Sequence, residues 1–304
     1  MWIEKKVVPL HSLKENKVKK QFRKERFLEM AKFGTYTEML NKVGVAYIGS
    51  VAQSAKLNYS FKNGVMTYGI YLAPSDMSGH NVCPCSKWCR DACLNGSGHN
   101  KADILHGGYE NSQVNKARIL KTRLFYEDRP LFMALVVKEI MRYKARAERL
   151  GMGFSIRLNC TSDLSPELFI DPYSGYNLLE RFEDIQFYDY TKVSPRLKLI
   201  GKYKNYDLTF SHDGHNWDDC KRFLDNGGKA AVVFKARELP RLFDGYKVED
   251  GNLWDMRYLN SPSSVIHLHY HVVANDYKIV NGKRRFVEPF SPFIIEKNDA
   301  RCIW

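Results

Sequence analysis

The sequence contains no run of eighteen apolar residues, so it predicts no membrane-spanning helix. It also lacks a glycine-rich P-loop, a G-x-G-x-x-G fingerprint and a G-x-S-x-G elbow, and the last absence argues against an α/β-hydrolase. The first residues are too polar to form the core of a signal peptide. We therefore expect a protein of the cytoplasm that has no membrane partner.

Acidic residues are few beside the basic ones. The 34 Asp and Glu residues stand against 47 Lys and Arg, which gives a formal net charge of +13. Such an excess favours polyanionic partners such as nucleic acid, a nucleotide or an acidic membrane surface, although a soluble basic enzyme would show it too. With 44% hydrophobic residues the chain can bury a large core, and this proportion excludes a disordered chain, a collagen and a coiled-coil rod.

The N-terminal segment is rich in basic residues. Apolar residues recur at helical spacing between Val18 and Phe33, which predicts an amphipathic helix. On that helix Lys17, Lys20 and Lys24 share one side, at steps of three and four residues. This basic stripe is a candidate nucleic-acid contact, and the alternative is a solvated face on a helix that packs against its own domain.

A hairpin is predicted next, from Lys56–Phe61 through Asn63-Gly64 to Met66–Leu72, because Asn-Gly between two β-rich runs is a strong hairpin signal. Beyond it, residues 110–150 show the pattern of two helices. Five short apolar runs then alternate with plausible helices, which predicts a parallel sheet. The runs are Phe154–Leu158, Ile185–Tyr190, Tyr206–Phe210, Ala230–Phe234 and Val265–Tyr270.

Such alternation predicts an α/β protein whose core is a partial, open β/α barrel, with a doubly wound open sheet as the alternative. A second Asn-Gly pair, Asn281-Gly282, predicts a hairpin near the C-terminus. The expected organisation is an extension with the basic helix and first hairpin over residues 1–64, the β/α core over 65–275 and a C-terminal hairpin and tail over 276–304.

The strongest chemical signal is four thiols within eleven residues: Cys83, Cys85, Cys89 and Cys93. A cysteine cluster in a chain without a secretion signal is typical of a metal or redox site in a reducing compartment. Thiolate ligands suit zinc, copper(I) or iron–sulfur groups. The gaps of one, three and three residues favour an iron–sulfur cluster over zinc, because structural zinc commonly uses two separated pairs and no second C-x-x-C pair exists downstream. Zinc and redox-active thiols remain open.

A three-cysteine loop after an early strand, followed by β/α units, resembles the radical S-adenosylmethionine enzymes. In that family three cysteines hold a [4Fe–4S] cluster, whose remaining iron binds S-adenosylmethionine. The usual family spacing is C-x3-C-x2-C. Here Cys85, Cys89 and Cys93 give C-x3-C-x3-C, and Cys83, Cys89 and Cys93 give C-x5-C-x3-C, so both sets depart from it.

A closer resemblance covers most of the chain. The string YLAPSDMSGHNVCPCSKWCRDACL, together with IRLNCTSDLS, FYDYTK, YDLTFS, AAVVF and DGNLWDMR, is similar to a phage-encoded protein family with a radical-SAM-like cysteine motif. The resemblance implies that Cys83, Cys89 and Cys93 are the ligands and that Cys85 is an additional thiol. It implies a fold and a cofactor rather than a substrate, and a bacteriophage protein that works in the bacterial cytoplasm.

Polar residues follow four of the predicted strands. Ligands bind at the carboxyl ends of parallel strands, so these residues could converge on one site, although Ser, Thr and Asp also cap helices there. Asp163 and Asp189 could hold the ribose hydroxyls or the amino group of a nucleoside, and Lys192 and Arg157 could hold a carboxylate or phosphate. With Asn159, these four residues form the predicted cofactor site.

Three histidines, His267, His269 and His271, alternate on one predicted strand and would face the same side. They could bind a transition metal, or they could form a polar wall of the sheet. Because Asp250 and Asp255 lie just before this strand, a metal-dependent nuclease stays an alternative.

The resemblance predicts an iron–sulfur enzyme that uses S-adenosylmethionine to generate a 5′-deoxyadenosyl radical, with flavodoxin or ferredoxin as reductant. The positive charge suggests a nucleotide or nucleic-acid substrate. The alternatives are a nucleic-acid-binding phage protein with a structural metal site and no catalysis, and the nuclease.

Overall fold

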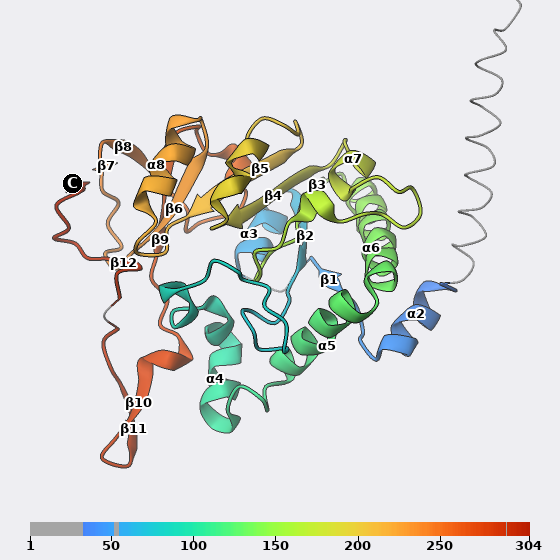
Figure 1. Ribbon diagram of the computed structural model, residues 1–304, viewed down its shortest axis with the longest axis horizontal. Coiled ribbons are helices and arrows are strands. Elements are labelled where there is room, and N and C mark those ends of the chain that lie inside the picture. The colour runs from blue at the N-terminus through green and yellow to red at the C-terminus, as the bar shows by residue number, and fades with distance from the viewer. Residues whose placement is uncertain (1–32, 52–54, 290) are drawn as a thin grey trace, which may run out of the picture.

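The computed structural model describes residues 33–51, 55–289 and 291–304 (Figure 1). The predicted stripe of Lys17, Lys20 and Lys24 lies outside the described residues. Most of the described strands belong to one sheet. Along its path the order is β1 (Gly49–Ser50), β2 (Val65–Ile70), β3 (Gly153–Arg157), β4 (Gln186–Thr191), β5 (Tyr206–Ser211), β6 (Lys229–Phe234), β9 (Ser264–His269), β8 (Tyr246–Asp250), β7 (Leu242–Phe243) and β13 (Cys302–Ile303).

The strands from β2 to β8 along this path run parallel, and antiparallel pairs add the short strands at both edges. The strand β12 (Ile294–Ile295) pairs in parallel with the end of β6. Within the described part of the chain no pairing joins the two ends of the path, so the sheet is open. The expected mostly parallel α/β architecture is confirmed at this level.

Helices lie between the strands, as the alternating pattern predicts. They are α2 (Tyr36–Val43), α3 (Ala55–Lys62), α4 (Gly98–Gly107), α5 (Gln113–Glu127), α6 (Arg129–Arg149), α7 (Leu178–Arg181) and α8 (Trp217–Asp225). Short 3-10 turns are η1 (Trp88–Arg90), η2 (Leu94–Gly96), η3 (Pro166–Leu168), η4 (Ser194–Leu199), η5 (Arg257–Leu259) and η6 (Ala274–Asp276). None of the described helices is long and apolar enough to pass through a membrane.

The helix ends follow from local sequence. Ser112 caps α5 by accepting a hydrogen bond from the Asn115 amide, and Asp128 caps α6 through the Leu131 amide. Pro130 stands in the first turn of α6, where a proline leaves no hydrogen bond broken. These caps explain why both helices were predictable from the sequence.

The sheet has an apolar face and a polar face. Tyr68, Phe187 and Phe210 lie on the apolar face, where α6 packs on β2 and β3 and α8 packs on β5 and β6. The polar face carries Thr67 and Ser155, whose hydroxyls lie 2.8 Å apart. The core therefore forms between the sheet and the helices of its apolar face.

The predicted N-terminal hairpin is wrong. Residues 55–62 form the helix α3, in which the buried residues Leu57 and Ser60 recur at helical spacing. Gly64, with a φ of 81°, lies in the turn between the end of this helix at Lys62 and the start of β2 at Val65. Asn-Gly serves a helix C-terminus as well as a hairpin turn, because both need a positive φ, and only the packing of the preceding segment distinguishes them.

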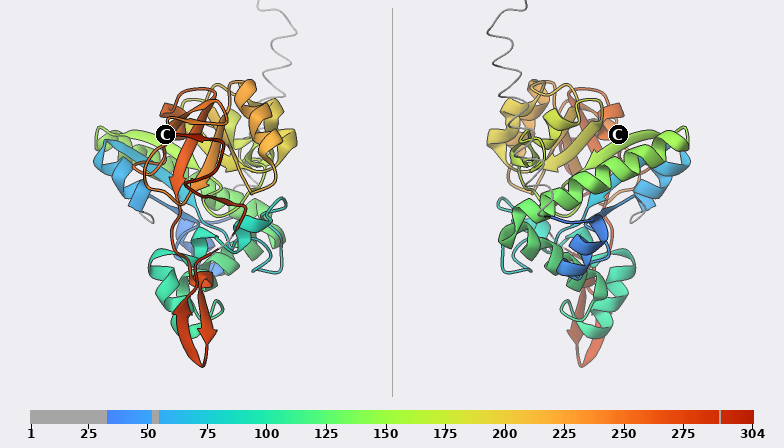
Figure 2. Two further views of the ribbon diagram at one scale, coloured as in Figure 1. Left: turned by 90° about the vertical axis from the view of Figure 1, so that its left-hand side faces the viewer. Right: turned by 90° about the vertical axis from the view of Figure 1, so that its right-hand side faces the viewer.

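The C-terminal hairpin is confirmed. β10 (Tyr277–Val280) pairs with β11 (Lys283–Phe286), and Asn281 and Gly282 between them have φ values of 50° and 70°. Two successive positive φ values are the signature of a type I′ turn. The hairpin projects away from the main sheet (Figure 2).

Candidate functional site: a cysteine loop beside the ends of the parallel strands

The four clustered cysteines lie in the loop of residues 73–97, hereafter the cysteine loop, which follows the carboxyl end of β2. Two hydrogen bonds join this segment to the loop after β3. The Asp163 amide donates to Val82 O at 2.8 Å, and the Thr161 hydroxyl donates to Leu72 O at 2.6 Å. The cysteine loop is therefore held at the edge where parallel strands of the sheet end.

Cys83, Cys89 and Cys93 share one electrostatic neighbourhood. The pKa of Cys83 is raised to about 11, and burial is the largest cause. The charges of Cys93 and Cys89 contribute to this rise, and a hydrogen bond from the Ser75 amide opposes it. Burial also raises the pKa of Cys93, and the charge of Cys89 adds to this effect. These are the three residues that the sequence resemblance assigns as ligands.

Cys85 has different neighbours. Its pKa is raised by burial and then by the charges of Asp163 and Asp213, and Lys192 opposes the shift. The charges that act on Cys85 therefore belong to residues after β3, β4 and β5, and no other thiol is among these causes. All seven cysteines are free thiols.

The thiols are available to a metal group, but the described part of the chain contains no set of three His, Cys, Asp or Glu side chains arranged around one metal ion. The chemistry of the donors nevertheless fits a soft, thiolate-bound group, since Cys83, Cys89 and Cys93 are partly exposed and neighbour one another. The positive charges of Arg118 and Lys192 oppose the rise in the pKa of Cys93 that burial causes. Positive charge beside a thiol stabilises the thiolate that a metal requires.

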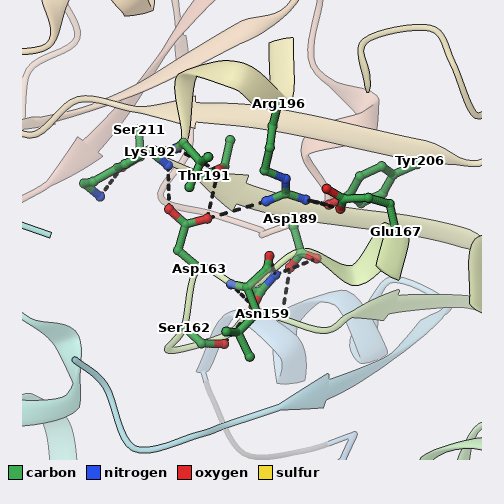
Figure 3. Close-up of polar contacts among 12 residues, drawn as sticks. Asn159, Ser162, Asp163, Glu167, Asp189, Thr191, Lys192, Arg196, Tyr206 and Ser211 are labelled. Carbon is green, nitrogen blue, oxygen red and sulfur yellow. Dashed lines mark hydrogen bonds and ion pairs between the residues drawn. The ribbon is translucent and has the colours of Figure 1, made fainter. Parts of the chain in front are cut away.

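Asn159, Asp163, Asp189 and Lys192 lie near one another in two hydrogen-bonded groups, hereafter the strand-end network (Figure 3). Asp189 accepts hydrogen bonds from the Asn159 amide at 2.8 Å and from the Asn159 side chain at 3.3 Å. Asp163 accepts from the Thr191 hydroxyl and the Lys192 amide, both at 2.7 Å. Each carboxylate therefore holds neighbouring segments at the strand ends together, and the role of these four residues in binding a cofactor stays a prediction.

Arg196 extends this network on its buried side. Its guanidinium is 3.5 Å from Asp163, 3.1 Å from Glu167 and 2.6 Å from the Tyr206 hydroxyl (Figure 3). Lys192 extends it on the other side, where its ammonium donates to the Ser211 hydroxyl at 3.0 Å. Since Lys192 acts on Cys85 and Cys93, and Asp163 bonds to Val82 and acts on Cys83 and Cys85, both residues neighbour the cysteine loop.

Asp189 is only 1% exposed, and burial raises its pKa to about 7. Arg157, the Asn159 amide and Arg196 oppose this shift, and Asp163 adds to it. A carboxyl whose pKa lies near neutrality can exchange a proton at physiological pH, which is a property of general acids and bases.

Arg157 makes its ion pair away from the other predicted cofactor residues, although its charge still acts on Asp189. It lies on the polar face of the sheet, where it pairs with the buried carboxylate of Asp255 and stands 4.6 Å from the centre of the Tyr190 ring. The Tyr190 hydroxyl donates to the same carboxylate at 3.3 Å. Arg157 is the last residue of β3, and its side chain lies on the polar face of the sheet. Asn159, two residues later, lies in the loop that follows β3.

The family model described as Gene product 88 matches residues 45–283. The chain belongs to the Gene product 88 family. No curated protein and no solved structure matches it. The matched span contains the cysteine loop, the strand-end network and every parallel strand from β2 to β9. The resemblance to a phage-type protein family is thereby confirmed at the level of the family.

In this member of the Gene product 88 family, the imidazole ring of His267 on β9 has a structural role. His267 is buried and stacks on Phe234 with ring centres 4.7 Å apart. Its Nδ1 lies 3.0 Å from the Asn252 side-chain nitrogen and its Nε2 lies 3.1 Å from Ala236 O, so both nitrogens have partners. A neutral ring that donates through Nε2 and accepts at Nδ1 satisfies both contacts.

His267, His269 and His271 all line a cavity of about 420 Å³ together with Asp250 and Arg237. Asp250 accepts hydrogen bonds from the amide and side chain of Asn252. Asp255, the second acid of the predicted nuclease site, is instead paired with Arg157 on the polar face. The structure therefore brings the three histidines and Asp250 to one cavity, whereas Asp255 is paired elsewhere.

A buried asparagine network beside the cysteine loop was absent from the sequence prediction. Asn95 and Asn100 both donate to the side-chain oxygen of Asn115, each at 3.1 Å, and Asn95 accepts a hydrogen bond from Arg118. The Asn95 amide also donates to Cys93. The sequence feature that could have indicated this network is the presence of Asn95 and Asn100 soon after Cys93 and of Asn115 on α5. Asparagines are common in turns, however, and their spacing does not show whether they are buried.

Proposed function

We propose that this protein is an iron–sulfur enzyme of the radical S-adenosylmethionine type that acts on a nucleotide or nucleic-acid substrate in a bacterial cytoplasm. The observation that carries the proposal is the shared neighbourhood of Cys83, Cys89 and Cys93 in a loop beside the ends of parallel strands. Support also comes from the consecutive parallel order β2 to β6, which is the strand order of an open β/α barrel.

Three thiolates in one loop, with Arg118 and Lys192 nearby, would hold a [4Fe–4S] cluster. A cluster bound there would supply one-electron reduction chemistry toward S-adenosylmethionine, with the electron coming from a carrier such as flavodoxin or ferredoxin. Lys192 is placed to hold an anionic group of a ligand between the strand ends and the cysteine loop. Asp189 and Asp163 position the loops around it.

The deciding experiment is anaerobic purification of the full chain with iron and sulfide, followed by absorption spectroscopy and metal analysis. The proposal expects a brown protein with a broad band near ~400 nm, about four iron atoms per chain, and heat on titration with S-adenosylmethionine. A colourless protein with one zinc ion per chain would contradict it and would support a structural metal site. A cluster without any heat from S-adenosylmethionine would retain the iron–sulfur assignment and reject the radical mechanism.

A further inference from the structure

The C-terminal hairpin of β10 and β11 is exposed over nearly its whole length. Each strand has four residues, and all of them except Tyr277 are exposed. Within the described part of the chain the hairpin forms a two-stranded sheet of its own. It extends away from the main sheet next to α4, where the Lys101 ammonium lies 5.8 Å from the centre of the Tyr277 ring (Figure 2). Such a hairpin has little core of its own and offers most of its surface to a partner.

The charge of this hairpin is positive throughout. Residues 277–287 contain no Asp or Glu. The acids on either side have other partners: Glu288 pairs with Lys235 at 2.7 Å, and the buried Asp276 accepts a hydrogen bond from the Tyr270 hydroxyl at 2.6 Å. The hairpin's charged side chains are all exposed cations, and among the described residues none of them forms an ion pair: Lys278, Lys283, Arg284 and Arg285.

The register of the hairpin places three of these cations on one face. Lys278 pairs with Arg285 across the two strands, and Val280 pairs with Lys283. Opposite residues share a face of a sheet, and so do residues two apart on one strand, so Lys278, Lys283 and Arg285 point to the same side. Like charges directly opposite one another destabilise a pair of strands, and a bound polyanion would remove that repulsion.

The base of the hairpin is joined to the cysteine loop. The Asn275 side chain donates to Asp91 O at 3.1 Å and accepts from the Tyr109 hydroxyl at 2.9 Å. The Val287 amide donates to Asp276 O at 2.7 Å, which closes the hairpin at the same end. The hairpin therefore starts at the border of the candidate site, and a long ligand bound along it would lie beside the cysteine loop.

We propose that this hairpin is a contact with duplex DNA and that it enters the major groove, with Lys278, Lys283 and Arg285 toward the DNA. The major groove is about 12 Å wide and about 8.5 Å deep and admits a two-stranded β-ribbon. Four residues at about 3.4 Å each give a ribbon of roughly 14 Å, which is long enough to reach the base edges. Lysine and arginine bind both phosphates and the guanine edge there.

Duplex DNA is favoured over duplex RNA as the partner, because the major groove of an RNA helix is too deep and narrow for side chains to read. The inference rests on the proposed function in taking the bound DNA as the substrate class, whereas the binding itself needs no cluster.

The test is fluorescence anisotropy on the full-length protein at several salt concentrations. The probes are a labelled DNA duplex, its single strand and an RNA duplex of the same sequence. The hairpin variant carries three changes that remove charge and keep polarity: Lys278→Gln, Lys283→Gln and Arg285→Gln. It should lose at least about tenfold in affinity for the DNA duplex, and its salt dependence should be less steep by about one for each lost phosphate contact.

A matched control loses the same charge at the opposite edge of the sheet. Its three positions are exposed and stand shortly before β2, β3 and β5, where the parallel strands begin: Lys62→Gln, Arg149→Gln and Lys204→Gln. Wild type and this control should bind the DNA duplex equally, and more tightly than the single strand or the RNA duplex. The predicted stripe of Lys17, Lys20 and Lys24 is intact in all three proteins, so its contribution is the same in each.

Unfolding would not be mistaken for lost binding, because the hairpin variant should have a Tm equal to or above that of wild type once opposed like charges are removed. Three results would overturn the inference: no binding of duplex DNA by wild type, equal affinity of wild type and the hairpin variant, and equal losses in the hairpin variant and the control. Tighter binding of the single strand or the RNA duplex would also overturn it.

Failure of the iron–sulfur function would appear separately, in the metal analysis of wild type. A protein without iron whose hairpin variant loses DNA would keep the hairpin contact and reject that function. An iron–sulfur protein whose hairpin variant binds DNA as wild type does would reject the hairpin contact alone.

Discussion

Arg118 donates a hydrogen bond to the side chain of Asn95, the second residue after Cys93 in the cysteine loop. The same asparagine gives its backbone amide to the Cys93 sulfur and its side-chain nitrogen to Asn115. A buried polar side chain with all its groups bonded is rigid, so α5 fixes the end of the cysteine loop. The placement of Cys93 therefore depends on residues twenty or more positions later in the chain.

Replacing Asn95 should show this dependence. In Asn95→Leu the Arg118 guanidinium and the Asn115 oxygen lose buried partners, and we expect the free energy of unfolding to fall by about 2–4 kcal/mol. Urea denaturation measures it. Asn58→Leu, at an exposed position, is the control and should change stability by less than about 0.5 kcal/mol. Equal losses in the two variants would show that the network does not hold the loop.

The ligand assignment predicts a pattern among the cysteines. Cys83→Ala, Cys89→Ala and Cys93→Ala should each abolish iron retention after anaerobic reconstitution, whereas the control Cys302→Ala should retain iron as wild type does. Cys85→Ala should also retain it, because no other thiol is among the charged groups that act on Cys85. Unchanged iron and sulfide content in two of the first three variants would show that the assignment is wrong.

Asp189 should make stability depend on pH in a defined direction. Its pKa is raised from 3.8 to about 7 in the folded protein, so between those values the folded state holds a proton that the unfolded state has lost. Its contribution to stability is therefore complete below pH ~4 and falls as pH rises to ~7. The free energy of unfolding of wild type, minus that of Asp189→Asn, should drop by roughly 3 kcal/mol between pH 4.5 and 7.5, at about 1.4 kcal/mol per pKa unit. A difference that rises over this range would contradict the shift.

The pair of Arg157 and Asp255 is buried on the polar face, with side chains 17% and 3% exposed. Asp255→Asn should destabilise the protein by about 3–5 kcal/mol, because the guanidinium keeps its charge without its partner. The double variant Arg157→Met with Asp255→Leu should recover much of that loss. Urea denaturation of Arg157→Met, of Asp255→Leu and of the double variant gives the coupling energy, and a coupling near zero would mean that the ion pair is not formed in solution.

The basic stripe of Lys17, Lys20 and Lys24 stays a prediction from the sequence. A gel-shift series should show that wild type binds DNA or RNA and that binding weakens steeply between two salt concentrations, because counterions are released from the phosphates. The triple change of these lysines to glutamate should remove that binding. If the triple variant binds as wild type does, the stripe makes no contact with nucleic acid.

Much of the fold follows from the sequence. All five predicted strands of the parallel sheet, the two helices before them and the C-terminal hairpin form where periodicity and turn residues place them. These signals are local: an apolar run between turn residues forms a strand largely regardless of what covers it. The N-terminal hairpin failed because Asn63-Gly64 suits two local structures, and the choice depended on the packing of Leu57 against the rest of the protein.

The sequence identified which residues belong to the candidate site, but it did not show how they are arranged. The cysteine cluster and the polar residues after successive strands were identifiable, because parallel strands bring their carboxyl ends to one edge. Tertiary structure decided the rest. Alternation along β3 put Arg157 on the polar face, away from Asn159. Folding also buried both Lys121 and Glu139, whose charge acts on Lys121, and such charge compensation depends on three-dimensional neighbours that no spacing along the chain reveals.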